Sequence, residues 1–379
     1  MENWQRFRNL FPHTSSIIYL NHAAVSPMNV RAIQALQEHM EKRSSVDIEF
    51  WPAAMETKKY FKTLLAKLLH THPDYIALTE NTSMGLNWLA RGLTWKKGDR
   101  ILLNNFEFPS NVYPFLNLRE LGVEIDFVEH RNGKILVEDL ARAIQPSTRL
   151  LSISFVEFLN GYRNDLATIS QLCQEHDIIF CVDAIQGLGA LDLDVEQLQI
   201  DFLAAAGHKW LMWPLGCGFF YISPRIFSRV KPMALGWMSV ENSWDFFNYE
   251  LTFPPTAERF EPSIYPVPTV IGAIPTLELF LEIGIPQIEQ RILYLTDYLI
   301  DGLRQRGYRL FTVTDPPHRS GIVTFYHPSP EELVAFLISQ QVKVSVRAGT
   351  VRVSPHFYNT TQELDRLLEL LDQFERKQS

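Results

Sequence analysis

The sequence predicts an α/β protein with a mainly parallel sheet, followed by a small α+β domain. Short continuous apolar runs alternate with helix-periodic segments between residues 76 and 222, which is typical of buried parallel strands joined by helices. A long amphipathic segment, three strand-like runs and a last helix follow residue 286. We expect an N-terminal segment (1–30) that joins the small domain, a large domain (31–255) and a small C-terminal domain (256–379).

Composition excludes several classes of protein. The chain has 379 residues, 46% hydrophobic and 21% charged, with a formal charge of -8. Lys and Arg are scattered, so we expect no nucleic-acid partner. No apolar run reaches the roughly 18 residues of a membrane span and the N-terminus lacks a signal-peptide core, so we expect no membrane partner. Three separated cysteines in apolar segments (Cys173, Cys181, Cys217) indicate reduced thiols and a cytoplasmic protein.

The elements of the large domain follow from apolar runs and helical spacing. The expected strands are residues 17–20, 76–79, 101–104, 123–128, 149–154, 178–182, 202–206 and 218–222. The expected helices are residues 52–70, a helix capped by Thr82 and Ser83, 137–144 and 167–176.

The C-terminal part begins after an irregular, aromatic and proline-rich connection over residues 237–268. Helices are expected at residues 269–282 and 286–306, and strands at 322–326, 343–346 and 351–354. The last helix begins at a capping box, Thr360-Thr-Gln-Glu363.

Polar and aromatic side chains collect where the predicted strands end. Ligands of parallel α/β sheets bind at the carboxyl ends of the strands. The residues at or just past those ends are Thr82, Phe108, Glu157, Asp183 and Lys209.

Lys209 follows an unusually apolar stretch, Asp201-Phe-Leu-Ala-Ala-Ala-Gly-His208. A partly desolvated lysine can be neutral near pH 7 and act as a nucleophile, which suits a Schiff base with an aldehyde cofactor. The alternative is a lysine at a strand end that extends its amine to water.

Two further features fit an aldehyde cofactor with a ring and a phosphate. Asp183, after the strand 178–182, can hold a pyridine ring nitrogen in its protonated form, or can simply cap a following helix. The helix start at Thr82 and Ser83, with Gly85 nearby, offers free N–H groups and hydroxyls for a phosphate, or is a plain N-cap. Together they form the requirement list for pyridoxal phosphate (PLP). There is no Walker loop, G-x-G-x-x-G or metal-ligand cluster, so no metal is expected.

Three motifs together resemble the core of a known family. They are Asp183-Ala-Ile-Gln186, Ala-Gly-His208-Lys209-Trp210 and Pro214-Leu-Gly-Cys-Gly218. This run is similar to the cofactor-binding core of class V aminotransferase-fold PLP enzymes (fold type I, aspartate-aminotransferase-like), which include cysteine desulfurases, kynureninases and isopenicillin N epimerase-like proteins. The similarity extends from Tyr19-Leu-Asn21 to Tyr358-Asn-Thr.

Around the cofactor ring, the resemblance implies roles for four residues. Lys209 forms the Schiff base with pyridoxal 5'-phosphate and later moves the α-proton of the substrate. Asp183 pairs with the pyridinium nitrogen, and Gln186 hydrogen-bonds the ring hydroxyl oxygen. Phe108 stacks on the ring face.

For the phosphate and the substrate, the resemblance implies further contacts. Thr82, Ser83 and His208 hold the phosphate. Arg352 binds the carboxylate of an amino acid substrate, a task that suits a guanidinium fork, and Asn21 lines the substrate site. The resemblance also implies a homodimer with its active sites near the interface.

The sequence departs from its relatives at several positions. Cysteine desulfurases carry a catalytic cysteine just before the carboxylate-binding arginine, but Val346-Arg-Ala-Gly-Thr-Val-Arg352 has none, and they use a histidine where Phe108 stands. Ala206 replaces a serine that contacts phosphate, and Ser263-Ile264 replaces the threonine that reaches the partner subunit. Glu157 stands where kynureninase-like chains have Asn or Ser, and is either a structural loop carboxylate or a site residue.

The expected function is that of a PLP-dependent enzyme acting on an α-amino acid through Lys209, as a class V aminotransferase. A lyase or an epimerase on the same scaffold is the alternative, and cysteine desulfurase chemistry is disfavoured. A non-catalytic protein on the same architecture is a further reading because fold does not fix function, but it is disfavoured because Lys209 and Asp183 are both present. The sequence does not name the amino acid.

Overall fold

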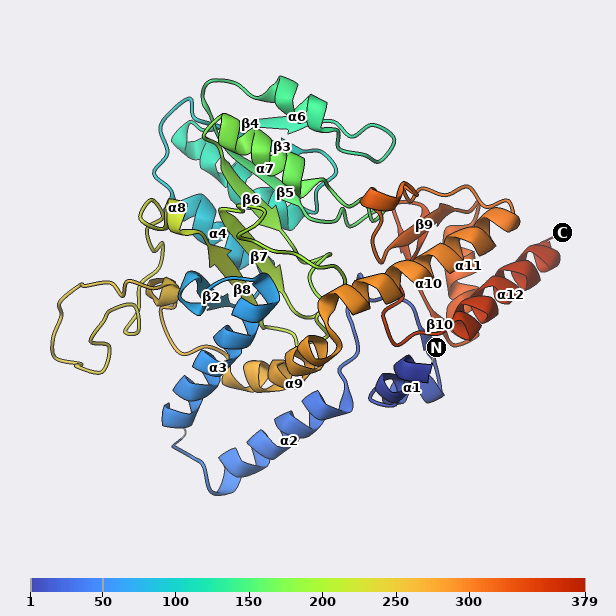
Figure 1. Ribbon diagram of the computed structural model, residues 1–379, viewed down its shortest axis with the longest axis horizontal. Coiled ribbons are helices and arrows are strands. Elements are labelled where there is room, and N and C mark those ends of the chain that lie inside the picture. The colour runs from blue at the N-terminus through green and yellow to red at the C-terminus, as the bar shows by residue number, and fades with distance from the viewer. Residues whose placement is uncertain (1, 50, 379) are drawn as a thin grey trace.

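A seven-stranded sheet forms the centre of the large domain in the computed structural model, which describes residues 2–49 and 51–378 (Figure 1). The strand order is β2-β8-β7-β6-β5-β3-β4. Parallel pairing joins β4, β3, β5, β6 and β7, whereas β8 runs antiparallel to both β7 and β2. The strand bounds are β2 Ile76–Thr79, β3 Arg100–Asn104, β4 Glu124–Val128, β5 Thr148–Ser154, β6 Ile179–Asp183, β7 Phe202–Ala206 and β8 Gly218–Ile222.

Helices and apolar side chains cover both faces of this sheet. Consecutive residues of one strand belong to different apolar clusters. In β6, Phe180 lies in one cluster and Cys181 in the other, and in β7 the same holds for Leu203 and Ala204. Alternation along a strand sends neighbouring side chains to opposite faces, so both faces are buried, as continuous apolar strands require. The helices of the large domain are α2 Val30–Ser45, α3 Trp51–Leu69, α4 Thr82–Gly92, α5 Tyr113–Leu116, α6 Val137–Ala143, α7 Leu166–Glu175 and α8 Pro224–Phe227.

In the C-terminal domain, α10, α11 and α12 share an apolar core with a three-stranded antiparallel sheet, ordered β11-β12-β9, whereas α9 packs against α2 and α3. The elements of this domain are α9 Val267–Ile283, α10 Ile285–Gln305, β9 Val323–Tyr326, α11 Pro330–Ser339, β10 Val342–Lys343, β11 Ser345–Arg347, β12 Thr350–Val353 and α12 Thr361–Gln378.

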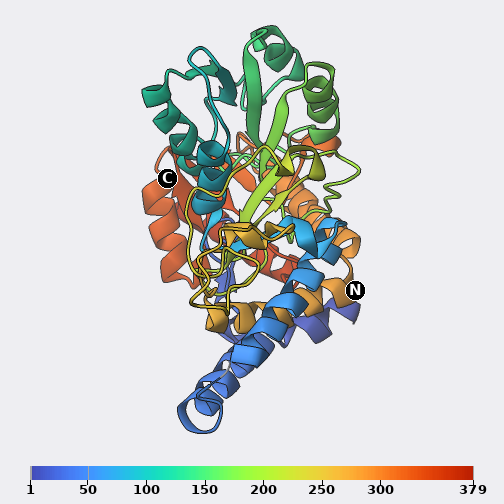
Figure 2. The same cartoon turned by 90° about the vertical axis from the view of Figure 1, so that its left-hand side faces the viewer.

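The N-terminal segment, which begins with α1 (Glu2–Arg8), is tied to this domain. Its strand β1 (Ile18–Tyr19) pairs in parallel with β10, and Asn21 forms a bridge with Ser354. Helices α2 and α3 pack against α9 and project together from the body of the molecule (Figure 2). Among the described residues no single helix is long and apolar enough to span a membrane; α9 and α10 meet that test only as a pair, by length and composition, and are bent by 83°.

The structure confirms most of the expected elements and corrects a few. The N-cap of α4 is Asn81, whose side chain accepts from the N–H of Met84 at 2.9 Å, and not Thr82 or Ser83. The strand expected at residues 343–346 is divided between β10 and β11. Helices α2 and α11 occupy residues to which the sequence analysis assigned no element. The capping box is confirmed, because the Thr360 N–H donates to Glu363 Oε2 at 3.0 Å and the Glu363 N–H donates to Thr360 Oγ1 at 3.3 Å.

Candidate active site

The strands that precede the predicted site residues end at one edge of the sheet. Ser154 lies opposite Asp183 in the β5–β6 pair, at the last residue of both strands. Thr79 and Ala206 both lie opposite Gly218, so the ends of β2 and β7 are also level. The loops after β2, β5, β6 and β7 therefore open on the same edge, where a doubly wound sheet binds its ligands.

Lys209 emerges from a turn that only glycine allows. A Cβ atom on Gly207 would lie 2.0 Å from the ring of Trp213, and the N–H of Trp213 closes the turn on the Gly207 carbonyl at 2.8 Å. The turn aims the side chain of Lys209 at Phe108, with Nζ 5.5 Å from the ring centre. Phe108 is 43% exposed and packs edge-on against Phe158, with ring centres 5.3 Å apart.

The surroundings of Lys209 favour its neutral amine. The pKa of Lys209 is lowered to about 8, chiefly by burial; the charge of Asp183 opposes this shift, and the positive charges of Arg352 and Arg347 add to it. A larger share of the amine is therefore neutral near pH 7 than for an exposed lysine, which is the form that attacks an aldehyde.

Asp183 and Gln186 are both buried. Burial raises the pKa of Asp183 to about 6, and the N–H of Ile185 (3.0 Å to Oδ1) and the charge of Lys209 counteract the rise. No helix follows Asp183 directly, so the helix-cap reading is wrong. Gln186 accepts from the indole N–H of Trp210 at 2.9 Å and donates to the Ala23 carbonyl at 3.1 Å, which leaves one amide N–H for a ligand.

The start of α4 carries a hydroxyl with no partner. Thr82 is 3% exposed, and its Oγ1 is buried and makes no hydrogen bond to any described residue. Ser83 donates to the hydroxyl of Ser110 at 2.8 Å. An unsatisfied buried hydroxyl beside the free N–H groups of a helix start is what a phosphate would complete. Burial, assisted by the charge of Lys209, lowers the pKa of His208 to about 4, so this residue would act there as a neutral ring.

Arg352 and Asn21 bring two more unsatisfied groups from the small domain and the N-terminal segment. Arg352 is 1% exposed, its Nη1 donates to the Phe158 carbonyl at 2.8 Å, and its Nε has no partner in the part of the chain that the structure describes. Among the described residues no carboxylate lies within 4.0 Å of this guanidinium. Burial, followed by the charge of Arg347, lowers its pKa to about 9. Oδ1 of Asn21 is likewise buried and unpaired.

Two glutamates complete the edge, and neither was assigned a role from the sequence. Glu107 and Glu157 are both buried, and Asn104 at the end of β3 donates to both, at 2.8 and 3.5 Å. The signal for Glu107 was available, because it follows a strand end and directly precedes Phe108.

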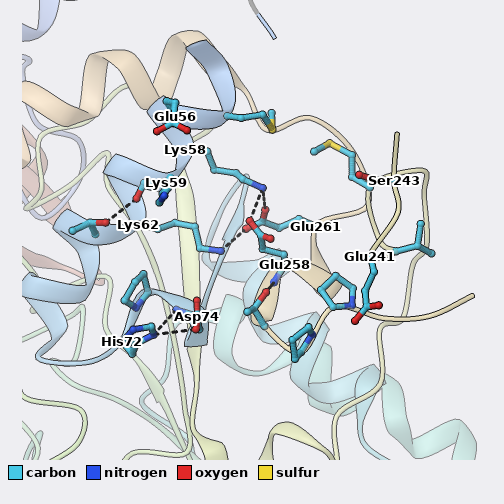
Figure 3. A pocket seen from close by; sticks show the side chains of 18 of the residues that line it. Glu56, Lys58, Lys59, Lys62, His72, Asp74, Glu241, Ser243, Glu258 and Glu261 are labelled. Atoms are coloured by element: carbon cyan, nitrogen blue, oxygen red, sulfur yellow. Dashed lines mark hydrogen bonds and ion pairs between the residues drawn. The ribbon is translucent and has the colours of Figure 1, made fainter. Parts of the chain in front are cut away.

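A separate cavity of about 760 Å³ lies between α3 and residues 238–261 (Figure 3). Its buried charges already satisfy one another. Lys58 Nζ lies 3.0 Å from both Glu258 and Glu261, and Lys62 Nζ lies 3.5 Å from Glu261. Because these charges are paired, the unsatisfied groups at the sheet edge form the better candidate site. No group of three metal-ligating side chains occurs among the described residues.

Comparison with known proteins agrees with this geometry. The profile of the class V aminotransferase family matches residues 18–367. A probable cysteine desulfurase of Pyrococcus abyssi (strain GE5 / Orsay) is 29% identical, over 97% of this chain and 96% of its own length. An uncharacterized aminotransferase of Bacillus subtilis (strain 168), YcbU, is 23% identical, over 96% of each chain.

Solved structures share the whole fold. The apo cysteine desulfurase from Thermococcus onnurineus NA1 superimposes with a TM-score of 0.89 at 26% identity, covering 97% of this chain and 96% of that one. A C-DES mutant with glycine covalently linked to its PLP cofactor superimposes with a TM-score of 0.89 at 24% identity, covering 96% and 99%. Because its identity to this chain is only 24%, the second structure supports the fold alone.

Proposed function

Because the chain belongs to the class V aminotransferase family, whose cofactor is pyridoxal 5'-phosphate, we propose that it acts on an α-amino acid by transamination. The observation that carries the proposal is the Lys209 amine. Its pKa is lowered to about 8, and the charges that act on it include the buried carboxylate of Asp183 and Arg352, whose Nε has no partner among the described residues.

The groups left unsatisfied at this edge fit the cofactor. The hydroxyl of Thr82 at the start of α4 suits its phosphate, and the carboxylate of Asp183 suits a cationic ring nitrogen. When bound, PLP supplies an aldehyde that captures the amine and a ring that withdraws electrons from the substrate Cα. Arg352 would orient the substrate through its carboxylate, since a buried guanidinium favours a bidentate anion.

Lys209 is the base that the surroundings favour for moving the α-proton. Phe108 carries no titratable proton, and His208, with its pKa lowered to about 4, is a weak base near pH 7. A single amine that takes the α-proton works on one face of the substrate, which supports transamination over epimerisation, because epimerisation delivers a proton to Cα from the opposite face. A β-elimination needs the same single base, so a lyase remains the second candidate.

Cysteine desulfurase chemistry is disfavoured because the segment before Arg352 carries no cysteine. The turn between β11 and β12 consists of Ala348 and Gly349, and no residue from 345 to 353 is a cysteine. The three cysteines of the chain are buried, and burial raises the pKa of each thiol. A buried protonated thiol is a poor nucleophile.

The test is a panel of α-amino acids mixed with PLP-loaded protein under single-turnover conditions. The proposal predicts that one group of amino acids converts bound PLP to its pyridoxamine form and yields the matching 2-oxo acid. Formation of pyruvate with ammonia or sulfide, and no pyridoxamine form, would assign a lyase instead. Loss of optical activity without either product would assign an epimerase.

A further inference from the structure

Glu107 and Glu157 form a buried carboxyl pair beside the candidate cofactor site. The side-chain amide of Asn104 donates to Oε1 of each, at 2.8 Å to Glu107 and 3.5 Å to Glu157. Asn164 also donates to Oε1 of Glu157, at 2.9 Å. The other oxygen of Glu157, Oε2, is buried and makes no hydrogen bond to any described residue.

The pair is connected to Asp183 through the end of β5. Ser154 donates to Glu107 from its N–H at 2.6 Å and from its hydroxyl at 2.5 Å, and it lies opposite Asp183 in the sheet. The next residue, Phe155, donates its N–H to the Asp183 carbonyl at 2.8 Å. Three buried carboxyl groups therefore gather at one point of the sheet edge.

Little positive charge balances these three groups. No Lys, Arg or His nitrogen of the described chain forms an ion pair with Glu107 or Glu157, and the titratable neighbours that face them besides Asp183 are Tyr162 and Cys181. Lys209 acts on Asp183, and neither glutamate is among the charges that shift the pKa of Lys209. Buried carboxylates without a cation cannot all be ionised, so the group must retain protons.

We propose that Glu107 and Glu157 share one proton in the apoprotein and release it when the cationic ring of PLP lies against Asp183. Before binding, the pair carries one negative charge and Asp183 carries another. After binding, the proton has left to solvent, the pair carries two negative charges, and the ring adds one positive charge. The summed charge of the three carboxyl groups and the ring nitrogen is the same before and after. The pair then holds the ring nitrogen protonated through Asp183, as positioning residues that do not touch the substrate.

Burial and mutual repulsion support this assignment. Burial raises the pKa of Glu107 to about 7, although the hydrogen bonds from Ser154 act against the rise. Burial, and next the charge of Glu107, raise the pKa of Glu157 well above its usual range. The inference rests on the proposed binding of PLP at this site, and the test below distinguishes a failure of the shared proton from a failure of PLP binding.

The test is an infrared difference spectrum between PLP-loaded and apo protein, recorded at neutral pH. The wild type should lose the C=O stretch of a protonated carboxyl group on binding PLP. Glu157→Gln keeps the acceptor for Asn164 but removes the shared proton. The spectrum of this variant should therefore show no loss of a carboxyl C=O band when PLP binds. Glu107→Gln is the second variant, with the same expected result. Asp165→Asn is the matched control, because Asp165 is an exposed N-cap eight residues along the chain.

The outcomes are distinct. Loss of the band in the wild type and in Asp165→Asn, but not in Glu157→Gln, supports the shared proton. An unchanged carboxyl region in the wild type, with PLP bound as shown by its visible absorption, overturns it. The same band loss in Glu157→Gln as in the wild type also overturns it. If PLP does not bind to the wild type at all, the cofactor assignment of the whole site fails instead.

Discussion

Arg352 donates a hydrogen bond of 2.8 Å to the backbone carbonyl of Phe158, while its Nε is buried and unpaired. A buried guanidinium without a carboxylate is costly, because its charge has lost water and gained one neutral acceptor. The hydrogen bond fixes Nη1 of the guanidinium and leaves the N–H of Nε available to a ligand. This arrangement keeps a binding position for an anion next to Lys209, and it links the small domain to the loop after β5.

Replacing Arg352 with lysine should weaken substrate binding and leave cofactor binding intact. Lysine keeps the charge but loses the bidentate fork. A charge-assisted hydrogen bond is worth about 1.5–3 kcal/mol, so kcat/KM should fall about 10- to 100-fold, mostly through KM. Steady-state kinetics with the best amino acid of the panel measure this. Arg149→Lys, in a distant pair with Asp99, is the control; an equal fall in both variants would remove Arg352 from the site.

Replacing Thr82 with valine should reduce PLP affinity without destabilising the apoprotein. The Thr82 hydroxyl has no partner within the described chain, so valine of the same shape removes only a polar group that PLP would satisfy. One hydrogen bond to a charged phosphate is worth about 1.5–3 kcal/mol, which predicts a Kd about 10- to 100-fold higher. Equilibrium titration of apoprotein measures the Kd, and thermal unfolding measures stability. Thr82→Ser should bind like the wild type; if it binds as weakly as valine, the hydroxyl is not the contact.

The rate at which apoprotein captures PLP should rise with pH through a midpoint near the Lys209 pKa of about 8. The neutral amine is the nucleophile, so the rate is low below the pKa and levels off above it. Asp183 raises this pKa, so Asp183→Asn should move the midpoint to lower pH. Stopped-flow absorbance across the pH range gives both curves. A midpoint near that of a free lysine, at about 10.4, would contradict the account.

The stability of apo Glu157→Gln relative to the wild type should increase as the pH rises from about 5 to about 8. The folded wild type holds protons on Glu107 and Glu157 more tightly than the unfolded chain does, since burial raises both pKa values. The free energy of unfolding of the wild type therefore falls as the pH rises through this window. The variant has one titrating carboxyl group fewer, so its free energy of unfolding falls less. Chemical denaturation at several pH values measures the difference, which should stay constant with pH for Asp165→Asn.

The sheet was largely predictable because its strands are short, apolar and buried on both faces. Strands β5, β6 and β7 were expected within a residue or two of their observed bounds. Helix α2 was not predicted, since Ala32 is its one buried residue and most of its residues are polar or charged. The register of β10 and β11 depends on pairing with β1 and β12, which local sequence does not encode.

The N-cap of α4 is a second feature that local sequence does not determine. Asn81, Thr82 and Ser83 are all good N-cap residues, so local preference alone cannot choose between them. The choice is made by packing, because the backbone of Asn81 lies against Gly218 of β8, where an added Cβ would come within 3.1 Å. With Asn81 as the cap, the hydroxyl of Thr82 is left free. The strand-end residues could be predicted from sequence, but the Glu107–Glu157 pair required the three-dimensional contacts of Asn104 and Ser154.

The most direct test is borohydride reduction of the PLP-loaded protein, followed by peptide mass spectrometry. The site predicts that reduction fixes one phosphopyridoxyl group on Lys209, that the yellow absorption bleaches, and that Lys209→Ala carries no such group. Lys58→Ala, which removes a lysine paired with Glu258 and Glu261, should keep the label on Lys209. A colourless protein that takes up no added PLP, or a label on another lysine with Lys209 unmodified, would contradict the account.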